Sequence, residues 1–171
     1  MSWQLIPGQV FGALETPDEM RSMRFKAQSP DEARKWQKKA RAKLFQLMMG
    51  GKKPEASPLN VELIKKESVP GASYSLVEMT MSSLPDRKIH IWLAIAERVA
   101  EGGLPGMLAL HGHGGTAEQV VRGEGIYWYG KAFAEKGYFV ASVDIGQHDL
   151  QHEDWSLMGE RMWDDLVCLD Y

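Results

Sequence analysis

The middle of the chain is patterned as β-structure. From residue 89 to residue 96 the order Ile-His-Ile-Trp-Leu-Ala-Ile-Ala alternates between two sets of side chains, as in a strand with one face in a core. Shorter runs at 61–64 and 74–79 also predict strands, and Pro85-Asp86 supplies a turn before the alternating run. We therefore expect an antiparallel section between Leu59 and Val99.

The start of the chain is patterned as helix. Thr16-Pro17-Asp18-Glu19 and Ser29-Pro30-Asp31-Glu32 each place a hydroxyl at the N-cap, proline at the first helical position and glutamate at the third. After Ser29, apolar residues recur at helical spacing until Gly50-Gly51, a typical helix end. Residues 1–58 are therefore predicted to be an N-terminal helical segment followed by a linker.

The last third of the chain alternates between the two kinds of element. An apolar run at 107–110, a helical pattern at 127–136, a second apolar run at 138–143 and a helical pattern at 157–171 follow one another. Strand, helix, strand and helix in this order predict a parallel βαβ unit. The expected fold class is α/β, with antiparallel front strands, then this unit, within a domain at 59–171.

Composition narrows the class of protein. The 171 residues carry a net charge of −3, which gives no basic surplus for nucleic acid. No apolar run approaches the roughly 18 residues of a membrane span, and the first residues do not have the pattern of a signal peptide. Cys168 is the only cysteine, so no intrachain disulfide is expected. We expect a cytoplasmic protein with neither nucleic acid nor membrane as a partner.

The candidate chemistry lies where the two apolar runs of the last third end. Ligands of open α/β sheets bind at the carboxyl ends of the strands, and here these ends are His111–Gly115 and Asp144–Asp149. A glycine-rich turn lets backbone amides approach a ligand closely, and such amides can stabilise a developing oxyanion. The first loop lacks the Gly-Lys-Ser/Thr ending of a phosphate loop, and it matches the dinucleotide fingerprint only weakly.

Three stretches carry a more specific likeness: Leu108–Gly115, Gly137–Asp144 and Trp163–Tyr171. Together they resemble the α/β-hydrolase superfamily, and within it the dienelactone-hydrolase and acetyl-xylan-esterase-like serine esterases, over residues 59–171. The resemblance implies serine-dependent hydrolysis of a carboxylic ester without a metal or organic cofactor. The partner would be a small-molecule ester, for which an acylated carbohydrate is one candidate.

The resemblance also implies roles for individual residues. The oxyanion-hole amides would belong to His113 and Gly114, since one such amide comes from the loop after the third family strand. The other loop residues, His111, Gly112 and Gly115, would hold the loop in place. Residues expected to line the pocket are Asp144, Gln147, His148 and Trp155.

A nucleophile is the missing element. The chain contains no Gly-x-Ser-x-Gly elbow: Gly71–Ser75 lacks the last glycine and precedes a strand, Ser156 lies in a polar stretch, and Cys168 lies within a predicted helix. The resemblance places the elbow after the helix at 157–171. We therefore expect the N-terminal half of a hydrolase, inactive alone, with all three catalytic residues downstream of Tyr171. The family strand order would leave 107–110 as an unpaired apolar edge, which favours self-association.

Two alternatives remain open from the sequence. His111, His113 and His148 are suitable zinc ligands, so a metal-dependent hydrolase is the first. A non-catalytic or vestigial hydrolase-like module is the second, because six tryptophans and ten methionines could form an interaction surface. Metal analysis and an esterase assay would separate the three hypotheses.

Overall fold

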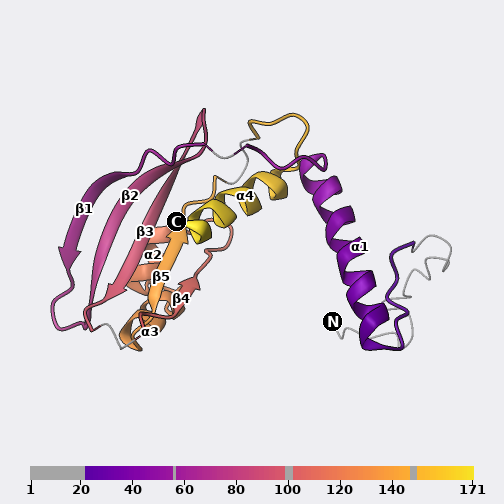
Figure 1. Ribbon diagram of the computed structural model, residues 1–171. Helices are drawn as coiled ribbons and strands as arrows, with labels where there is room; N and C mark the ends of the chain where they lie inside the picture. Colours follow the sequence, from indigo (N-terminus) through magenta and orange to yellow (C-terminus); the bar gives the residue numbers. More distant parts are fainter. Residues whose placement is uncertain (1–21, 56, 99–101, 147–149) are drawn as a thin grey trace, which may run out of the picture. The chain divides into compact units, whose positions relative to one another are not determined.

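The computed structural model describes residues 22–55, 57–98, 102–146 and 150–171. The chain divides into two compact units, residues 1–44 and 45–171, and the boundary lies inside the first helix. In chain order, the elements in Figure 1 are α1 (Pro30–Met49), β1 (Glu62–Ser68), β2 (Tyr74–Leu84), β3 (Arg87–Ala96), β4 (Gly106–Leu108), α2 (Ala117–Arg122), α3 (Tyr129–Glu135), β5 (Phe139–Val143) and α4 (Leu157–Asp170).

The start of α1 follows from its capping residues. Ser29 Oγ accepts a hydrogen bond from the Glu32 amide at 3.3 Å, and Glu32 Oε2 accepts one from the Gln28 amide at 2.8 Å. These bonds satisfy amides that the first helical turn leaves without partners. The helix predicted after Ser29 is confirmed, while the one predicted at Thr16 lies outside the described residues.

The second unit is built on one five-stranded sheet. Its strand order is β1-β2-β3-β5-β4, with antiparallel pairing from β1 through β5 and parallel pairing of β5 with β4. The β2–β3 hairpin turns at Pro85-Asp86, as predicted. The α/β fold class, with antiparallel front strands followed by a parallel pair, is therefore confirmed.

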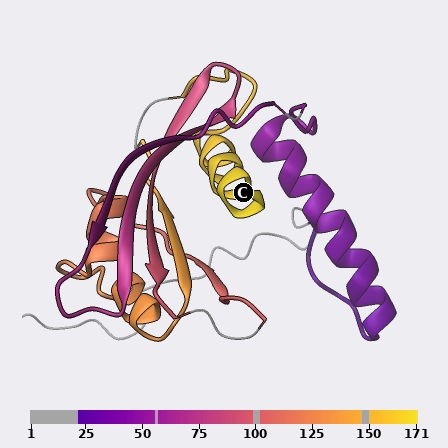
Figure 2. The same ribbon diagram turned by 60° about the vertical axis from the view of Figure 1, so that its left-hand side comes forward.

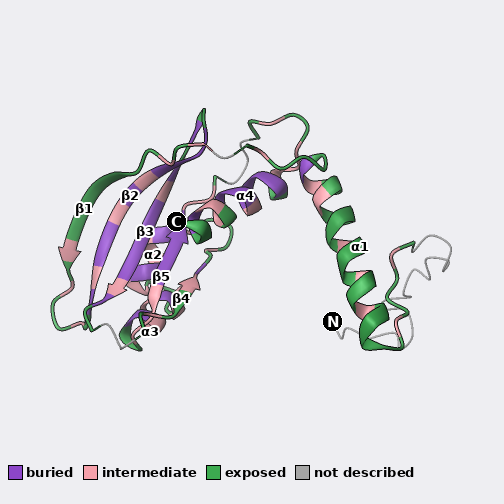
Figure 3. Ribbon diagram, in the orientation of Figure 1, coloured by how far each residue is buried: buried purple, intermediate pink, exposed green. Residues whose placement is uncertain are grey.

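Strand β3 divides the core into two layers because its side chains alternate. Trp92 and Ala94 face one side, where they pack with residues of α2 and α3, whereas Ile91 and Leu93 face α4 on the other side. Figure 2 shows α4 and the α2–α3 pair on opposite faces of the sheet. In Figure 3 the buried positions follow the central strands, as expected of strands covered on both faces.

Three elements differ from the predictions. Strand β4 ends at Leu108 instead of residue 110, and the Leu110 carbonyl accepts a hydrogen bond from the Tyr129 hydroxyl. Helix α3 is shorter than the predicted 127–136. Helix α2 was not predicted, although it opens with a capping box in which Thr116 and Gln119 bond to each other's amides.

A buried charge cluster attaches α4 to the end of the β2–β3 hairpin. The Arg87 guanidinium donates to both carboxylate oxygens of Asp164, with Nη2 at 2.7 Å from Oδ2 and Nε at 2.9 Å from Oδ1. The Ser83 hydroxyl donates to the same carboxylate at 2.6 Å. Glu160 Oε1 accepts the amides of Gln151 and His152 at 2.6 and 2.7 Å, so α4 also fixes the segment before it.

None of the helices in the described part of the chain is both long and apolar enough to cross a membrane.

Candidate functional site

The candidate site lies at the carboxyl ends of β4 and β5. These two strands run parallel and adjacent, so the loops that follow them meet at one edge of the sheet. A cleft of about 490 Å³ lies there. Its lining residues come from both loops and from the start of α4: His111, Gly112, His113, Ile145, Gly146, Ser156, Leu157, Met158 and Arg161.

The loop after β4 is fastened at both ends to the residues after β5. At its start, the Ile145 amide donates to His111 Nε2 at 3.0 Å, so Nε2 carries no proton and Nδ1 donates to the Gly112 carbonyl at 2.9 Å. At its end, the Ala117 amide donates to Asp144 Oδ1 at 2.6 Å. Two neighbouring residues of one segment therefore hold the whole glycine-rich loop.

Between these fastenings the chain forms a tight turn. The Gly115 amide donates to the Gly112 carbonyl at 3.0 Å, and Gly114 has a φ of +79°. Among the described residues only Asn60 is a non-glycine with positive φ, so His113 has a negative φ and the turn is of type II. A side chain at Gly115 would lie 2.6 Å from the Tyr127 hydroxyl, so any larger residue here would have to displace the Tyr127 ring.

The two expected oxyanion residues differ in position. His113 lines the cleft together with Gly112, whereas Gly114 is not among the lining residues. The Gly115 amide donates to the Gly112 carbonyl within the turn, and the Ala117 amide donates to the Asp144 carboxylate. Because only His113 of these two residues lines the cleft, its amide is the candidate donor to a ligand there.

The residues expected to line the pocket have other positions. Asp144 does not line the cleft, because its carboxylate binds the Ala117 amide and His90 Nδ1, the latter at 2.5 Å. Trp155 packs against Trp163, with ring centroids 6.3 Å apart, and also does not line it. Gln147 and His148 lie outside the described residues.

Helix α4 supplies lining residues that the sequence analysis missed. Arg161 is only 7% exposed, and its Nη1 lies 3.8 Å from Asp164 Oδ2 and 3.9 Å from Glu160 Oε2. A side chain at Gly146 would lie 3.2 Å from Arg161 Nη2, so the segment after β5 passes close to this guanidinium. Ser156 caps α4 by accepting the Gly159 amide, a local signal that the sequence analysis did not use and that would not have shown the relation of the helix to the cleft.

One acid beside the site has an unusual environment. Burial, and then the charge of Asp164, raise the pKa of Asp165 to about 6, while His111 opposes the rise. Its Oδ1 atom is buried and has no hydrogen-bond partner among the residues that the structure describes. At neutral pH this carboxylate is therefore ionised although its surroundings favour the protonated form.

The metal-dependent alternative finds no support in the described residues. Both ring nitrogens of His111 are already hydrogen-bonded, Nδ1 to the Gly112 carbonyl and Nε2 to the Ile145 amide, which leaves neither for a metal. No group of three or more histidine, cysteine, aspartate or glutamate side chains in the described ranges could hold an ion. His148, the third proposed ligand, lies outside them.

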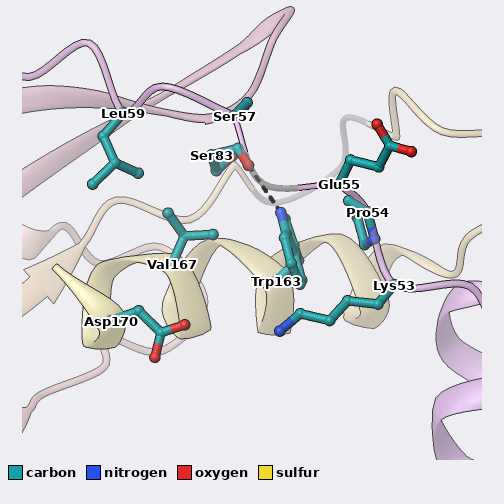
Figure 4. A pocket seen from close by; sticks show the side chains of 9 residues that line it. All are labelled: Lys53, Pro54, Glu55, Ser57, Leu59, Ser83, Trp163, Val167 and Asp170. Atoms are coloured by element: carbon teal, nitrogen blue, oxygen red, sulfur yellow. Dashed lines mark hydrogen bonds between the residues drawn. The ribbon is translucent and has the colours of Figure 1, made fainter.

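A second, smaller cavity of about 210 Å³ lies beside α4 (Figure 4). Its main polar contact is structural: Trp163 Nε1 donates to the Ser83 carbonyl at 2.9 Å, shown as a dashed line. Lys53 Nζ lies 5.8 Å from the centre of the Trp163 ring. The residues that line this cavity include no histidine or cysteine, so we place the candidate site at the cleft after β4 and β5.

Comparison with known proteins supports the fold. No protein-family model matches the sequence, and no curated protein matches it at a significant level. A solved structure from Bacteroides fragilis, described as that of an acetyl xylan esterase, matches with 23% identity and a TM-score of 0.68, covering 87% of this chain and 46% of that chain. A glucuronoyl esterase from Solibacter usitatus matches with 18% identity and a TM-score of 0.57, covering 83% of this chain and 49% of that chain.

These matches establish a likeness of fold to part of each of these two solved structures. The chain spans less than half the length of each of these esterases, 46% and 49%.

Proposed function

We propose that this chain forms the N-terminal part of a carboxylic-ester hydrolase and supplies its oxyanion-binding loop. The observation that carries the proposal is the type II turn at 112–115, which borders a cleft at the ends of two parallel strands. A backbone amide in such a turn is fixed before substrate arrives, and preorganised donors are what stabilise a developing negative charge.

The attacking side chain would come from elsewhere in the enzyme. Cys168 is buried within α4, and burial raises the pKa of its thiol to about 11, which makes it a poor nucleophile. Ser156 Oγ accepts the Gly159 amide and lies 3.3 Å from the Met48 carbonyl, without a histidine in its hydrogen bonds. We infer that the nucleophilic serine, its histidine and its acid follow Tyr171, so the residues described here are inactive alone.

The names of the two structural neighbours indicate which class of substrate to test. Both are named as esterases, one for acetyl xylan and one for a glucuronoyl ester. An acylated carbohydrate is therefore the substrate class to test first. The cleft of about 490 Å³ has room for a small acyl group and part of a sugar.

The activity test compares two lengths of the protein. The 171-residue chain should not hydrolyse a small activated acetyl ester, whereas the chain extended by its native downstream sequence should hydrolyse it. Hydrolysis by the short chain would contradict the assignment of the nucleophile to the downstream part. Absence of hydrolysis by a correctly folded extended protein, with both simple and carbohydrate esters, would contradict the proposal itself.

The role of the His113 amide can be tested with a matched pair of variants. Proline is favoured at the second position of a type II turn, so His113→Pro removes the amide hydrogen and keeps the turn. In the extended enzyme we expect kcat to fall about 100- to 1000-fold, the usual effect of losing one oxyanion donor. His113→Ala, which removes the side chain and keeps the amide, should retain most of the activity. Equal activity of the two variants would exclude the amide as a donor.

A further inference from the structure

His90 joins the candidate loop to the opposite part of the sheet. It lies on β3, and its imidazole has a carboxylate at each ring nitrogen: Nδ1 is 2.5 Å from Asp144 Oδ2 and Nε2 is 2.9 Å from Glu78 Oε1. An ionised carboxylate can only accept hydrogen bonds, so both nitrogens must donate. The arrangement therefore requires a doubly protonated, positively charged ring.

The Asp144 carboxylate has a separate task at its other oxygen. Oδ1 accepts the Ala117 amide at 2.6 Å, and Ala117 is the first residue of α2, directly after the loop and its cap. The Asp144 amide in turn donates to the His90 carbonyl at 2.9 Å. A change in the His90 ring is therefore transmitted to the end of the candidate loop through a single side chain.

We propose that His90 is a positioning residue for the loop at 111–116: as an imidazolium between Glu78 and Asp144, it sets the orientation of the carboxylate that fastens α2. The proposal rests on the proposed function, because it concerns the loop assigned to the oxyanion. A neutral ring can donate from only one nitrogen, so loss of the proton must break one of the two contacts.

The protonated state is favoured by its surroundings. Burial alone would lower the pKa of His90, but its hydrogen bonds to Asp144 and Glu78, and their negative charges, raise it above the ordinary value. On the loop, His111 Nε2 lies 4.0 Å from Asp144 Oδ1. On α2, the Arg122 guanidinium lies over the Trp92 ring and pairs with Glu67 and Glu118.

The experiment follows the loop amides by ¹H–¹⁵N NMR in the 171-residue chain, without substrate, from mildly acidic to alkaline pH. The Ala117 amide should shift with the same midpoint as the ring resonances of His90. In His90→Gln this transition should be lost, and the Ala117 and Gly114 resonances should be displaced from their wild-type positions at low pH.

Glu78→Gln is the decisive variant, because Glu78 contacts His90 and lies across the sheet from the loop. This substitution should lower the pH midpoints of the His90 ring resonances and of the Ala117 amide resonance together, by about 1 pH unit, since one nearby negative charge is removed. Lys88→Gln is the matched control: this exposed residue on β3 pairs with Glu62 at the surface, and its loss should leave both midpoints unchanged.

Two results would overturn the proposal. Either the Ala117 amide shows no transition that tracks His90, or its midpoint stays fixed in Glu78→Gln while that of His90 falls, which would assign the loop response to His111. If His90→Gln does not fold, Glu78→Gln alone decides. Because these spectra require no catalysis, they fail or succeed independently of the ester assay that tests the proposed function.

Discussion

Replacing Asp165 by asparagine should stabilise the protein at neutral pH. Burial and the adjacent charge of Asp164 raise the pKa of Asp165 from 3.8 to about 6. A difference of about two pH units corresponds to about 3 kcal/mol at 1.36 kcal/mol per unit. Since the side chain is only partly buried, water screens part of this energy, and we expect about 1–2 kcal/mol.

The sign of the effect follows from linkage. A pKa that is higher in the folded state favours folding while the group is protonated, and this contribution is lost as pH rises from about 3.8 through about 6. Wild type and Asp165→Asn should therefore have similar free energies of unfolding near the lower end of this pH range. As the pH rises through the range, the variant should become steadily more stable than wild type. Above it, the difference should stay constant.

The assay is urea unfolding of dilute protein at a series of pH values, followed by the fluorescence of the six tryptophans. Asp170→Asn, an exposed acid on the same helix, is the control and should change the free energy of unfolding by less than about 0.5 kcal/mol at every pH. An Asp165→Asn variant that is no more stable than wild type at neutral pH would refute the reasoning, because it would mean that the ionised carboxylate does not destabilise the folded state.

Further predictions concern packing and association. Asp164→Asn removes the nearer of two buried carboxylates that pair with Arg87, while Glu160 Oε2 stays 3.4 Å from Nη1, so the free energy of unfolding, measured by urea unfolding, should fall by at most about 3–5 kcal/mol. Gly115→Ala forces a methyl group against Tyr127 and should cost about 1–3 kcal/mol in the same assay, whereas Gly106→Ala, with open space around the new carbon, should be much milder. One edge of β4 has no partner in the sheet that the structure describes and should make the chain self-associate, so its sedimentation coefficient should rise with concentration; a constant monomeric value would contradict this.

The parts of the fold that were predicted depend on local signals. The alternation from residue 89 to residue 96 defined β3, and Ser29-Pro30 defined the start of α1. Helix α2 carried an equally local signal in Thr116 and Gln119, but its six residues are too few for a clear apolar period. The end of β4 was predicted wrongly because it depends on a distant residue: the Tyr129 hydroxyl, nineteen residues away, donates a hydrogen bond to the Leu110 carbonyl.

The sequence could propose a location for the candidate site but not the contacts made there. The glycine-rich turn at a strand end is visible in the sequence, and the structure places it at a cleft. The pairing of Arg87 with Asp164, across 77 residues, leaves no local pattern, and neither does the approach of Arg161 to Gly146. Asp144 was expected at the pocket because it ends a strand, yet its carboxylate satisfies a helix amide and a histidine instead.

The order of the strands has a consequence for synthesis on the ribosome. Strand β4 precedes β5 in the chain but lies outside it in the sheet, and β5 is its only partner in the described sheet. The β1–β3 meander can form as soon as it leaves the exit tunnel, since each strand pairs with its neighbour in sequence. Gly106–Leu108 cannot pair until residues 139–141 have emerged, so a nascent chain paused before that point carries an apolar segment without its strand partner.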